Sequence, residues 1–329
     1  MRYFMGSEKI RIWITAAGTS TSNGLIRSIR ESFQDQIFLI GSDINPEHLV
    51  PISKNVNKYE KSPPFKDETF RERFLKTVNE LEPDIIIPIL DEEISLIPRL
   101  VEKFDLPVKI VAPQIGSSDI VTDKLKAYEL MINYGIDTPK TWIATDSPNC
   151  NPPWIIKPRR GVGSVGVEIL NSIEDMKSIK SKLLDLDQYI MQESCSPPEF
   201  TIDTVIIPSK DIFAFACRER LETKAGVCTK ARIFMDDDLG DMARKIGACF
   251  SLDGAFCFQV MMDKNNPGKY LVTDINPRVG GGTRLSVIAG FNIHSILISH
   301  LIGASIRNDW LKLNSSEVYV TRQFQEVLM

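Results

Sequence analysis

The segment Val272-Thr273-Asp274-Ile275-Asn276-Pro277-Arg278 carries a polar or charged residue at every second position from Asp274 onward. If the segment is extended, alternate side chains point to one face, so Asp274, Asn276 and Arg278 form a row while Ile275 faces the core. The proline after Asn276 cannot donate to a ladder and ends the strand. The segment therefore predicts a strand with a carboxylate, an amide and a guanidinium on one face.

The preceding apolar segment, Ala255–Met262, contains one polar residue in its centre, Gln259. If the two segments close a hairpin with Asp263 opposite Tyr270, Gln259 lies opposite Asp274. Carboxylate and amide oxygens on neighbouring strands suit Mg²⁺ held between protein and phosphates. A polar network without a metal is the alternative interpretation. The predicted metal ligands are Gln259, Asp274 and Asn276.

The run Gly280-Gly281-Gly282-Thr283 leads from Arg278 into a helix predicted from Thr283 to about Ile302. Backbone N–H groups at a helix N-terminus attract anions. An arginine beside a metal and an anion nest is the arrangement that phosphoryl transfer needs. Arg278 and Asn276 are therefore the predicted catalytic residues.

A second glycine-rich segment, Gly161–Gly166, matches G-x-G-x-x-G but lies between two predicted strands, which is the wrong context for a dinucleotide site. A glycine loop between strands is typical of a flap whose N–H groups face phosphates. Lys157 ends the strand before the flap, and Lys124 opens a helix where the dipole disfavours a cation. For Lys124 alone, a solvated surface position is the alternative; together the two lysines favour phosphate binding. The predicted flap residues are Gly161, Gly163, Ser164 and Gly166.

The first strand is followed by a glycine-containing turn with Gly18 and Gly24, and Asp43 ends the second strand. This context is compatible with a dinucleotide-binding oxidoreductase. The three glycines of that fingerprint are missing, however, so a tight strand-to-helix turn is the favoured interpretation.

Composition excludes several classes of protein. The net charge is −4 with the basic residues dispersed, which gives no nucleic-acid footprint. No apolar run approaches the roughly 20 residues of a membrane helix, and no signal peptide is expected. The six cysteines form no C-x-x-C pair, so we expect reduced thiols and a cytoplasmic protein.

Short apolar runs alternate with helical patterns in the first third of the chain, which predicts a doubly wound parallel sheet. The middle third has short strands and one helix near 173–184, as in a small α+β lid. The last third has longer strands that pair as hairpins in an antiparallel sheet. We therefore expect an α/β protein with domains at 1–115, 116–190 and 191–329.

These motifs, in this order, resemble the ATP-grasp superfamily. They comprise Ile155–Pro158 before the glycine flap, Met191–Glu193 leading to Pro198–Thr201, and Asp274–Arg278. The likeness is closest to one synthetase half of the carbamoyl phosphate synthase large subunit and to stand-alone amino-acid ligases. Two features depart from the pattern: Asp274 stands where the family usually has Glu, and the chain carries a single ATP unit.

The resemblance implies a ligase that uses ATP and Mg²⁺, with Mn²⁺ as an alternative ion. Lys124 and Lys157 would contact the phosphates under the flap, and Arg278 would stabilise the transferred phosphoryl group. Glu199 would bind the ribose. The hinge that meets adenine would include Gln192, Glu193 and Cys195.

The substrates implied are a small-molecule carboxylate, activated as an acyl phosphate, and a nucleophile, an amine. A homodimer is common among such ligases. A non-catalytic ATP-binding sensor, or a partial carbamoyl-phosphate-synthase-like enzyme that needs a partner, is the alternative.

Two other pairs of charged residues each allow two interpretations. Arg218 and Arg220 would share a strand face and meet a carboxylate or the γ-phosphate, or form a solvated charged edge. Asp91 and Glu92 either recognise a substrate amine or cap a helix.

Overall fold

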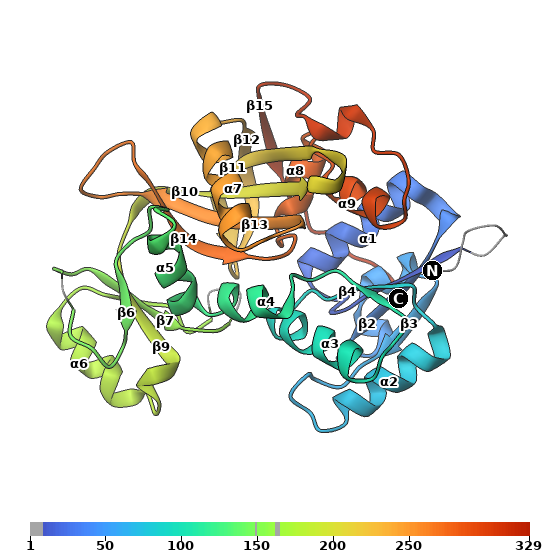
Figure 1. The fold of residues 1–329 in the computed structure, drawn as a ribbon, viewed down its shortest axis with the longest axis horizontal. Helices are drawn as coiled ribbons and strands as arrows, with labels where there is room; N and C mark the ends of the chain where they lie inside the picture. The colour runs from blue at the N-terminus through green and yellow to red at the C-terminus, as the bar shows by residue number, and fades with distance from the viewer. Residues whose placement is uncertain (1–8, 149, 162–164) are drawn as a thin grey trace.

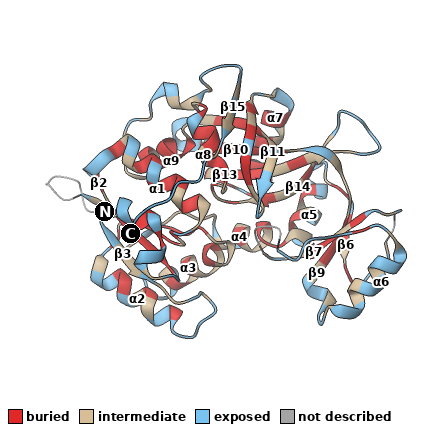
Figure 2. Ribbon diagram, turned by 180° about the vertical axis from the view of Figure 1, so that it is seen from behind, coloured by how far each residue is buried: buried red, intermediate tan, exposed pale blue. Residues whose placement is uncertain are grey.

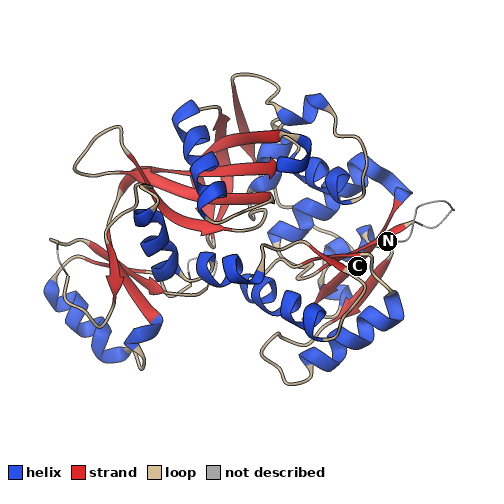
Figure 3. Cartoon of the chain, in the orientation of Figure 1, coloured by secondary structure: helices blue, strands red, loops and turns tan. Residues whose placement is uncertain are grey.

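Three β-sheets organise the computed structural model, which describes residues 9–148, 150–161 and 165–329. The first sheet lies at the lower right of Figure 1, the second at the lower left, and the third above both. Helices α4 (Ile115–Val121) and α5 (Lys124–Asn133) run between the first two sheets (Figure 3). No helix in the described part of the chain is long and apolar enough to cross a membrane.

The N-terminal sheet is parallel throughout and has the strand order β3-β2-β1-β4-β5. Helix α1 (Ser20–Phe33) packs on one face through Leu25, Ile26 and Ile29, and α2 (Phe70–Leu81) and α3 (Asp91–Lys103) cover the other. This is the doubly wound arrangement that the sequence predicts. The strands are β1 (Ile10–Ile14), β2 (Ile37–Asp43), β3 (Lys58–Lys61), β4 (Ile85–Ile87) and β5 (Lys109–Ile110).

The second sheet is small and has the strand order β6-β9-β7-β8. Its core contains Trp142, Trp154 and Met191, and α6 (Ile173–Lys182) packs against this core. The outer face of α6 is exposed (Figure 2). The strands are β6 (Thr141–Ile143), β7 (Trp154–Pro158), β8 (Glu168–Leu170) and β9 (Tyr189–Glu193). Strand β9 extends across residues 190 and 191, where the second and third predicted domains meet.

The third sheet is antiparallel, with the strand order β14-β13-β10-β11-β12-β15. On β13, the fully buried Phe256, Phe258 and Val260 pack toward α7 (Asp237–Cys249), so Cys257 and Gln259 face the other side, as the period of two requires. The strands are β10 (Ser196–Ile207), β11 (Ile212–Lys224), β12 (Val227–Phe234), β13 (Gly254–Met262), β14 (Tyr270–Asn276) and β15 (Glu317–Thr321).

Several elements differ from the sequence-based expectation. The single closing helix predicted for 283–302 is wrong, because the chain breaks into α8 (Thr283–Ile288) and α9 (Ile293–Leu301). Between them Gly290 has φ +116°, a conformation that ends a helix and that other residues rarely adopt. Strands β3, β12 and β15 were not predicted; β15 is a largely exposed edge strand, and polar residues interrupt its apolar pattern.

Candidate nucleotide and metal site

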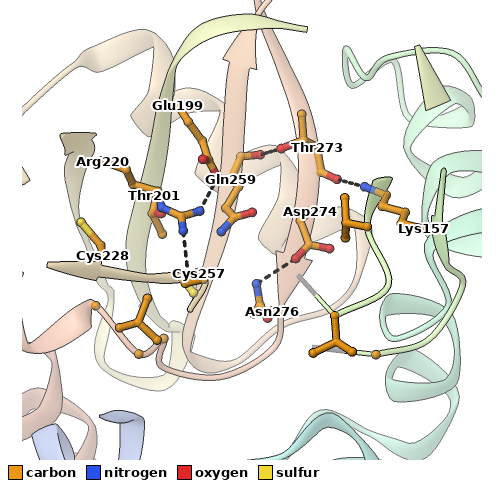
Figure 4. A pocket seen from close by; sticks show the side chains of 18 of the residues that line it. Lys157, Glu199, Thr201, Arg220, Cys228, Cys257, Gln259, Thr273, Asp274 and Asn276 are labelled. Carbon is orange, nitrogen blue, oxygen red and sulfur yellow. Dashed lines mark hydrogen bonds and ion pairs between the residues drawn. The ribbon is translucent and has the colours of Figure 1, made fainter. Parts of the chain in front are cut away.

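A cavity of about 420 Å³ lies between the second and third sheets. Strands β13 and β14 form one wall, and Lys157 reaches in from the opposite side (Figure 4). Most of the predicted site residues line this cavity. They are Lys124, Lys157, Gly161, Gln192, Glu193, Cys195, Glu199, Gln259, Asp274, Asn276 and Arg278.

The predicted flap is only partly described. Gly161 lines the cavity, whereas Gly166 does not, although its φ of +73° favours glycine. The predicted residues Gly163 and Ser164 lie outside the described residues.

The β13–β14 hairpin places Gln259 opposite Asp274, as predicted, but by a different register. Met262, not Asp263, lies opposite Tyr270, so the assumed turn is wrong by one residue. A bulge at Thr273 adds one residue to β14 and restores the pairing of Gln259 with Asp274.

The polar row on β14 forms as the alternation predicts. Asn276 Nδ2 donates to Asp274 Oδ2 at 3.4 Å, and Arg278 Nη2 donates to Asn276 Oδ1 at 3.3 Å. Arg278 Nε also donates to Asp91 Oδ1 at 3.0 Å. Asp91 is in the first turn of α3, with Leu90 at the N-cap position. It therefore neither caps the helix nor stands free for an amine; it joins the N-terminal sheet to the polar row.

Lys157 is held on β7 by two hydrogen bonds inside the protein. Its Nζ donates to Gln192 Oε1 at 2.9 Å and to the carbonyl of Thr273 at 3.0 Å, the bulged residue. The pKa of Lys157 is lowered to about 8, mainly by burial; Asp274 opposes this shift and the nearby charge of Lys124 adds to it. An anion that entered the cavity would stabilise the protonated lysine.

Lys124 also points into the cavity, so the solvated alternative is wrong. Its Nζ donates to the carbonyl of Gly161 at 3.0 Å and lies 3.8 Å from Asp274 Oδ1. Asp123 caps α5 by accepting from the N–H groups of Leu125 and Lys126. Lys124 is at the first helical position, from which its side chain reaches the base of the flap.

The predicted hinge residues lie where the chain passes from the second sheet to the third. Gln192 is buried in β9, and its Nε2 donates to Thr141 Oγ1 at 2.8 Å, which orients the oxygen that holds Lys157. Glu193 lies 3.4 Å from Lys264 Nζ. Burial raises the pKa of the Cys195 thiol to about 11, so this thiol stays neutral at physiological pH.

Both arginines of β11 line the cavity, and β11 is an interior strand, so a solvated charged edge is wrong. Arg220 donates to the carboxylate of Glu199. Arg218 is 2% exposed and lies 3.3 Å from Asp203, which is fully buried and also accepts from the hydroxyls of Thr283 and Ser286. Asp203 was not predicted; a single acid in the mainly apolar stretch 200–207 of β10 is the same signal that identified Gln259.

The dinucleotide alternative is not supported by the geometry of Asp43. Its carboxylate accepts from the N–H of Gly18 at 2.8 Å and from the N–H and Nδ2 of Asn45 at 3.0 and 2.8 Å. Asp43 thereby fixes the strand-to-helix turn, and a Cβ at position 18 would lie 2.9 Å from its Oδ2. This carboxylate is committed to the turn rather than available to a ribose.

Comparison with known proteins agrees with this geometry. Residues 185–322 match the model of a family described as ATP-grasp in the biosynthetic pathway with Ter operon. No curated protein sequence matches the chain.

Several solved structures share the fold of most of this chain. N5-carboxyaminoimidazole synthetase from Staphylococcus aureus, complexed with ADP, is 17% identical with a TM-score of 0.72, over 92% of this chain and 80% of that one. Biotin carboxylase from Campylobacter jejuni is 16% identical with a TM-score of 0.72, over 93% and 74%. L-amino acid ligase from Bacillus licheniformis is 14% identical with a TM-score of 0.71, over 94% and 78%. The predicted superfamily is confirmed: residues 185–322 match an ATP-grasp family, and the chain as a whole has the ATP-grasp fold.

Proposed function

We propose that this protein is an ATP-dependent ligase that phosphorylates a substrate carboxylate and couples the acyl phosphate to a nucleophile, an amine. The observation that carries the proposal is one cavity with lysines on one side and the Gln259–Asp274–Asn276 oxygens on the other. Three structures with this fold are a synthetase, a carboxylase and an amino-acid ligase, which supports ligation at a coarse level.

The two lysines would bind the phosphates of ATP. Lys157 is anchored by two acceptors, so its ammonium needs little ordering when a phosphate arrives. Lys124 would draw the base of the flap toward the phosphates through the Gly161 carbonyl. Glu199, with its carboxylate fixed by Arg220, would accept from the ribose hydroxyls.

The side-chain oxygens of Gln259, Asp274 and Asn276 fit Mg²⁺ in part. Among residues 9–148, 150–161 and 165–329, no three His, Cys, Asp or Glu residues gather at metal-binding spacing. One carboxylate and two amides suit a hard ion that takes its remaining ligands from phosphates and water, and Mn²⁺ accepts the same donors. The amide of Asn276 directs Nδ2 toward Asp274, so it would rotate to offer its oxygen. A bound ion would neutralise phosphate charge during transfer.

Arg278 would act on the phosphoryl group during its transfer. It lies at the end of the polar row, and its guanidinium is positioned by Asp91 and Asn276. A cation held there stabilises the charge on the phosphoryl group and then on the acyl phosphate. Closure of the second sheet over the cavity would exclude water from that intermediate.

The test is phosphate release from Mg-ATP, screened against pools of amino acids and other carboxylic acids. A pool that triggers release with the native protein, but not with Asp274→Ala, supports the ligase and identifies the acid class. ATP binding without release from any pool would favour the sensor, and release that requires an added protein would favour the partial enzyme.

Nucleotide affinity should depend on pH through Lys157. Because a bound phosphate raises the pKa of Lys157 from about 8, protonated lysine favours binding and deprotonation weakens it. Kd for Mg-ATP is therefore expected to rise above pH 8, by up to about tenfold per pH unit. Calorimetry between pH 7 and pH 10 measures this change.

Lys157→Arg is the matched control for this pH dependence, because its guanidinium stays charged throughout the range. Its Kd should be nearly constant from pH 7 to pH 10. An equal rise of Kd in the native and Lys157→Arg proteins would remove Lys157 from the phosphate site.

A further inference from the structure

The N-terminus of α1 begins with four consecutive hydroxyl residues, Thr19-Ser20-Thr21-Ser22, and the fold uses two of them. Thr19 Oγ1 accepts from the N–H of Ser22 at 3.3 Å and donates to the carbonyl of Ala16 at 2.8 Å. Ser22 Oγ donates to the carbonyl of Thr15 at 2.8 Å. Capping and anchoring of the helix are thus complete without the two central hydroxyls.

Ser20 and Thr21 line the cavity instead. Thr21 is only 7% exposed, and within the described residues its hydroxyl has no hydrogen-bond partner, nor has that of Ser20. The Thr21 hydroxyl is not among the described buried atoms that lack a partner, so it is open to the cavity, where it can donate to a bound group. The first N–H groups of this 14-residue helix also lack intrahelical acceptors and favour negative charge.

The glycine run connects this helix end to the polar row. Asn276 lies opposite Cys257 in the hairpin, and a Cβ at Gly280 would lie 3.0 Å from Cys257 Sγ. A Cβ at Gly281 would lie 2.7 Å from Ser20 Oγ. The glycines therefore let α1 approach the cavity floor. The helix N-terminus is next to the reaction site but separated from Asn276 by the glycine run.

Carboxylates of the cavity wall offer little to an ammonium group. Each described one lies beside a cation: Glu193 by Lys264, Glu199 by Arg220, and Asp274 by Lys124. Asp91, the residue predicted as a possible amine ligand, pairs with Arg278. Near α1 the cavity is lined by hydroxyls, apolar residues and the glycine run, with the Arg218 guanidinium against Gly282 and without a described acid. The hydrogen-bond donors in this part of the cavity suit an anion.

We propose that the N-terminus of α1 binds a second anionic group of the acid substrate, a carboxylate or a phosphate, remote from the carboxylate that is activated. The hydroxyls of Ser20 and Thr21 and the first N–H groups of α1 donate to it. The substrate class is then a dicarboxylic or phosphorylated acid without a recognised ammonium group. This inference rests on the ligase function proposed above.

The first experiment measures anion binding with the γ-phosphate position filled. Protein saturated with Mg and the non-hydrolysable analogue AMPPNP is titrated calorimetrically with inorganic phosphate and, separately, with succinate. Thr21→Val removes the hydroxyl at constant shape and should weaken binding by about tenfold to a hundredfold, as for a hydrogen bond to a charged group. Thr21→Ser keeps the hydroxyl and should bind nearly as the native protein does.

The two probes distinguish a phosphate from a carboxylate as the preferred group. Equal affinity in Thr21→Val and native protein, or no binding of either probe to the native protein, would overturn the anion site. Ser20→Ala provides a second variant if Thr21→Val does not fold, as judged by circular dichroism.

The second experiment separates this site from the ligase proposal itself. Phosphate release is screened with dicarboxylic, phosphorylated, monocarboxylic and amino acids. We expect the first two classes to react, and Thr21→Val to raise KM for the acid while KM for ATP stays unchanged. Release with simple amino acids that Thr21→Val leaves unaltered would refute the anion site but keep the ligase. Failure of AMPPNP to bind the native protein would refute the ligase.

Discussion

Replacement of Asp274 by asparagine is expected to lower kcat by at least about 1,000-fold, equivalent to about 4 kcal/mol of transition-state stabilisation. The substitution keeps the shape and an oxygen that can still accept from Asn276 Nδ2. It removes the only carboxylate of the Gln259–Asp274–Asn276 row. Kd for ATP should change much less than kcat, because Lys124 and Lys157 remain in place.

The size of this effect follows from what the charge does at the centre of the cavity. With Asp274 neutral, a metal held between phosphates and protein loses its one anionic protein ligand, and amide oxygens alone bind Mg²⁺ weakly. Asp274 also raises the pKa of Lys157, so that pKa should fall further below about 8 in the variant. Assays at a pH well below the lowered pKa keep Lys157 protonated and isolate the metal effect.

The matched control is Asp263→Asn at the tip of the same hairpin. Asp263 accepts from the N–H of Asn265 and from Nδ2 of Asn266, and it does not line the cavity. Single-turnover phosphate release, with the acid found by screening, should be nearly native in Asp263→Asn. Native activity in Asp274→Asn would exclude the metal assignment.

How far the sequence predicts this site depends on which residues carry a local signal. The alternation from Asp274 to Arg278 and the isolated polar Gln259 in an apolar strand are local patterns. The residues that form these patterns line the cavity as expected. The parallel and antiparallel sheets follow from the same kind of pattern. These elements could be predicted because periodicity is a property of a few consecutive residues.

The remaining features depend on residues that are distant in the sequence. The bulge at Thr273 has no signal in the sequence, yet its carbonyl anchors Lys157, which is 116 positions away. The hairpin of β10 and β11 follows from the sequence pattern, but the ion pair of Asp203 with Arg218 across it has no signal in either strand alone. The partner of Arg278 is Asp91 on α3, a helix that packs on the N-terminal sheet. Contacts of this kind are set by tertiary packing.

Replacement of Arg278 by methionine is expected to lower kcat by about 1,000-fold or more, because arginines that meet a phosphoryl group in transit contribute effects of this size. Methionine retains most of the apolar volume but no charge. Kd for ATP, measured by calorimetry, should change by less than about tenfold, since Arg278 lies beyond the lysines at the end of the polar row.

A structural explanation must be separated from this catalytic one, because Arg278 forms an ion pair with Asp91 in which both side chains are mostly buried, with 13% and 14% exposed. Removal of the arginine leaves the carboxylate unpaired, which should lower the free energy of unfolding by about 1–3 kcal/mol. The double variant Arg278→Met/Asp91→Asn removes both charges and should regain most of that stability in urea denaturation. If the arginine acts on the phosphoryl group, activity stays lost in this stabilised double variant. If activity returned together with stability, Arg278 would serve only to join α3 to the end of β14.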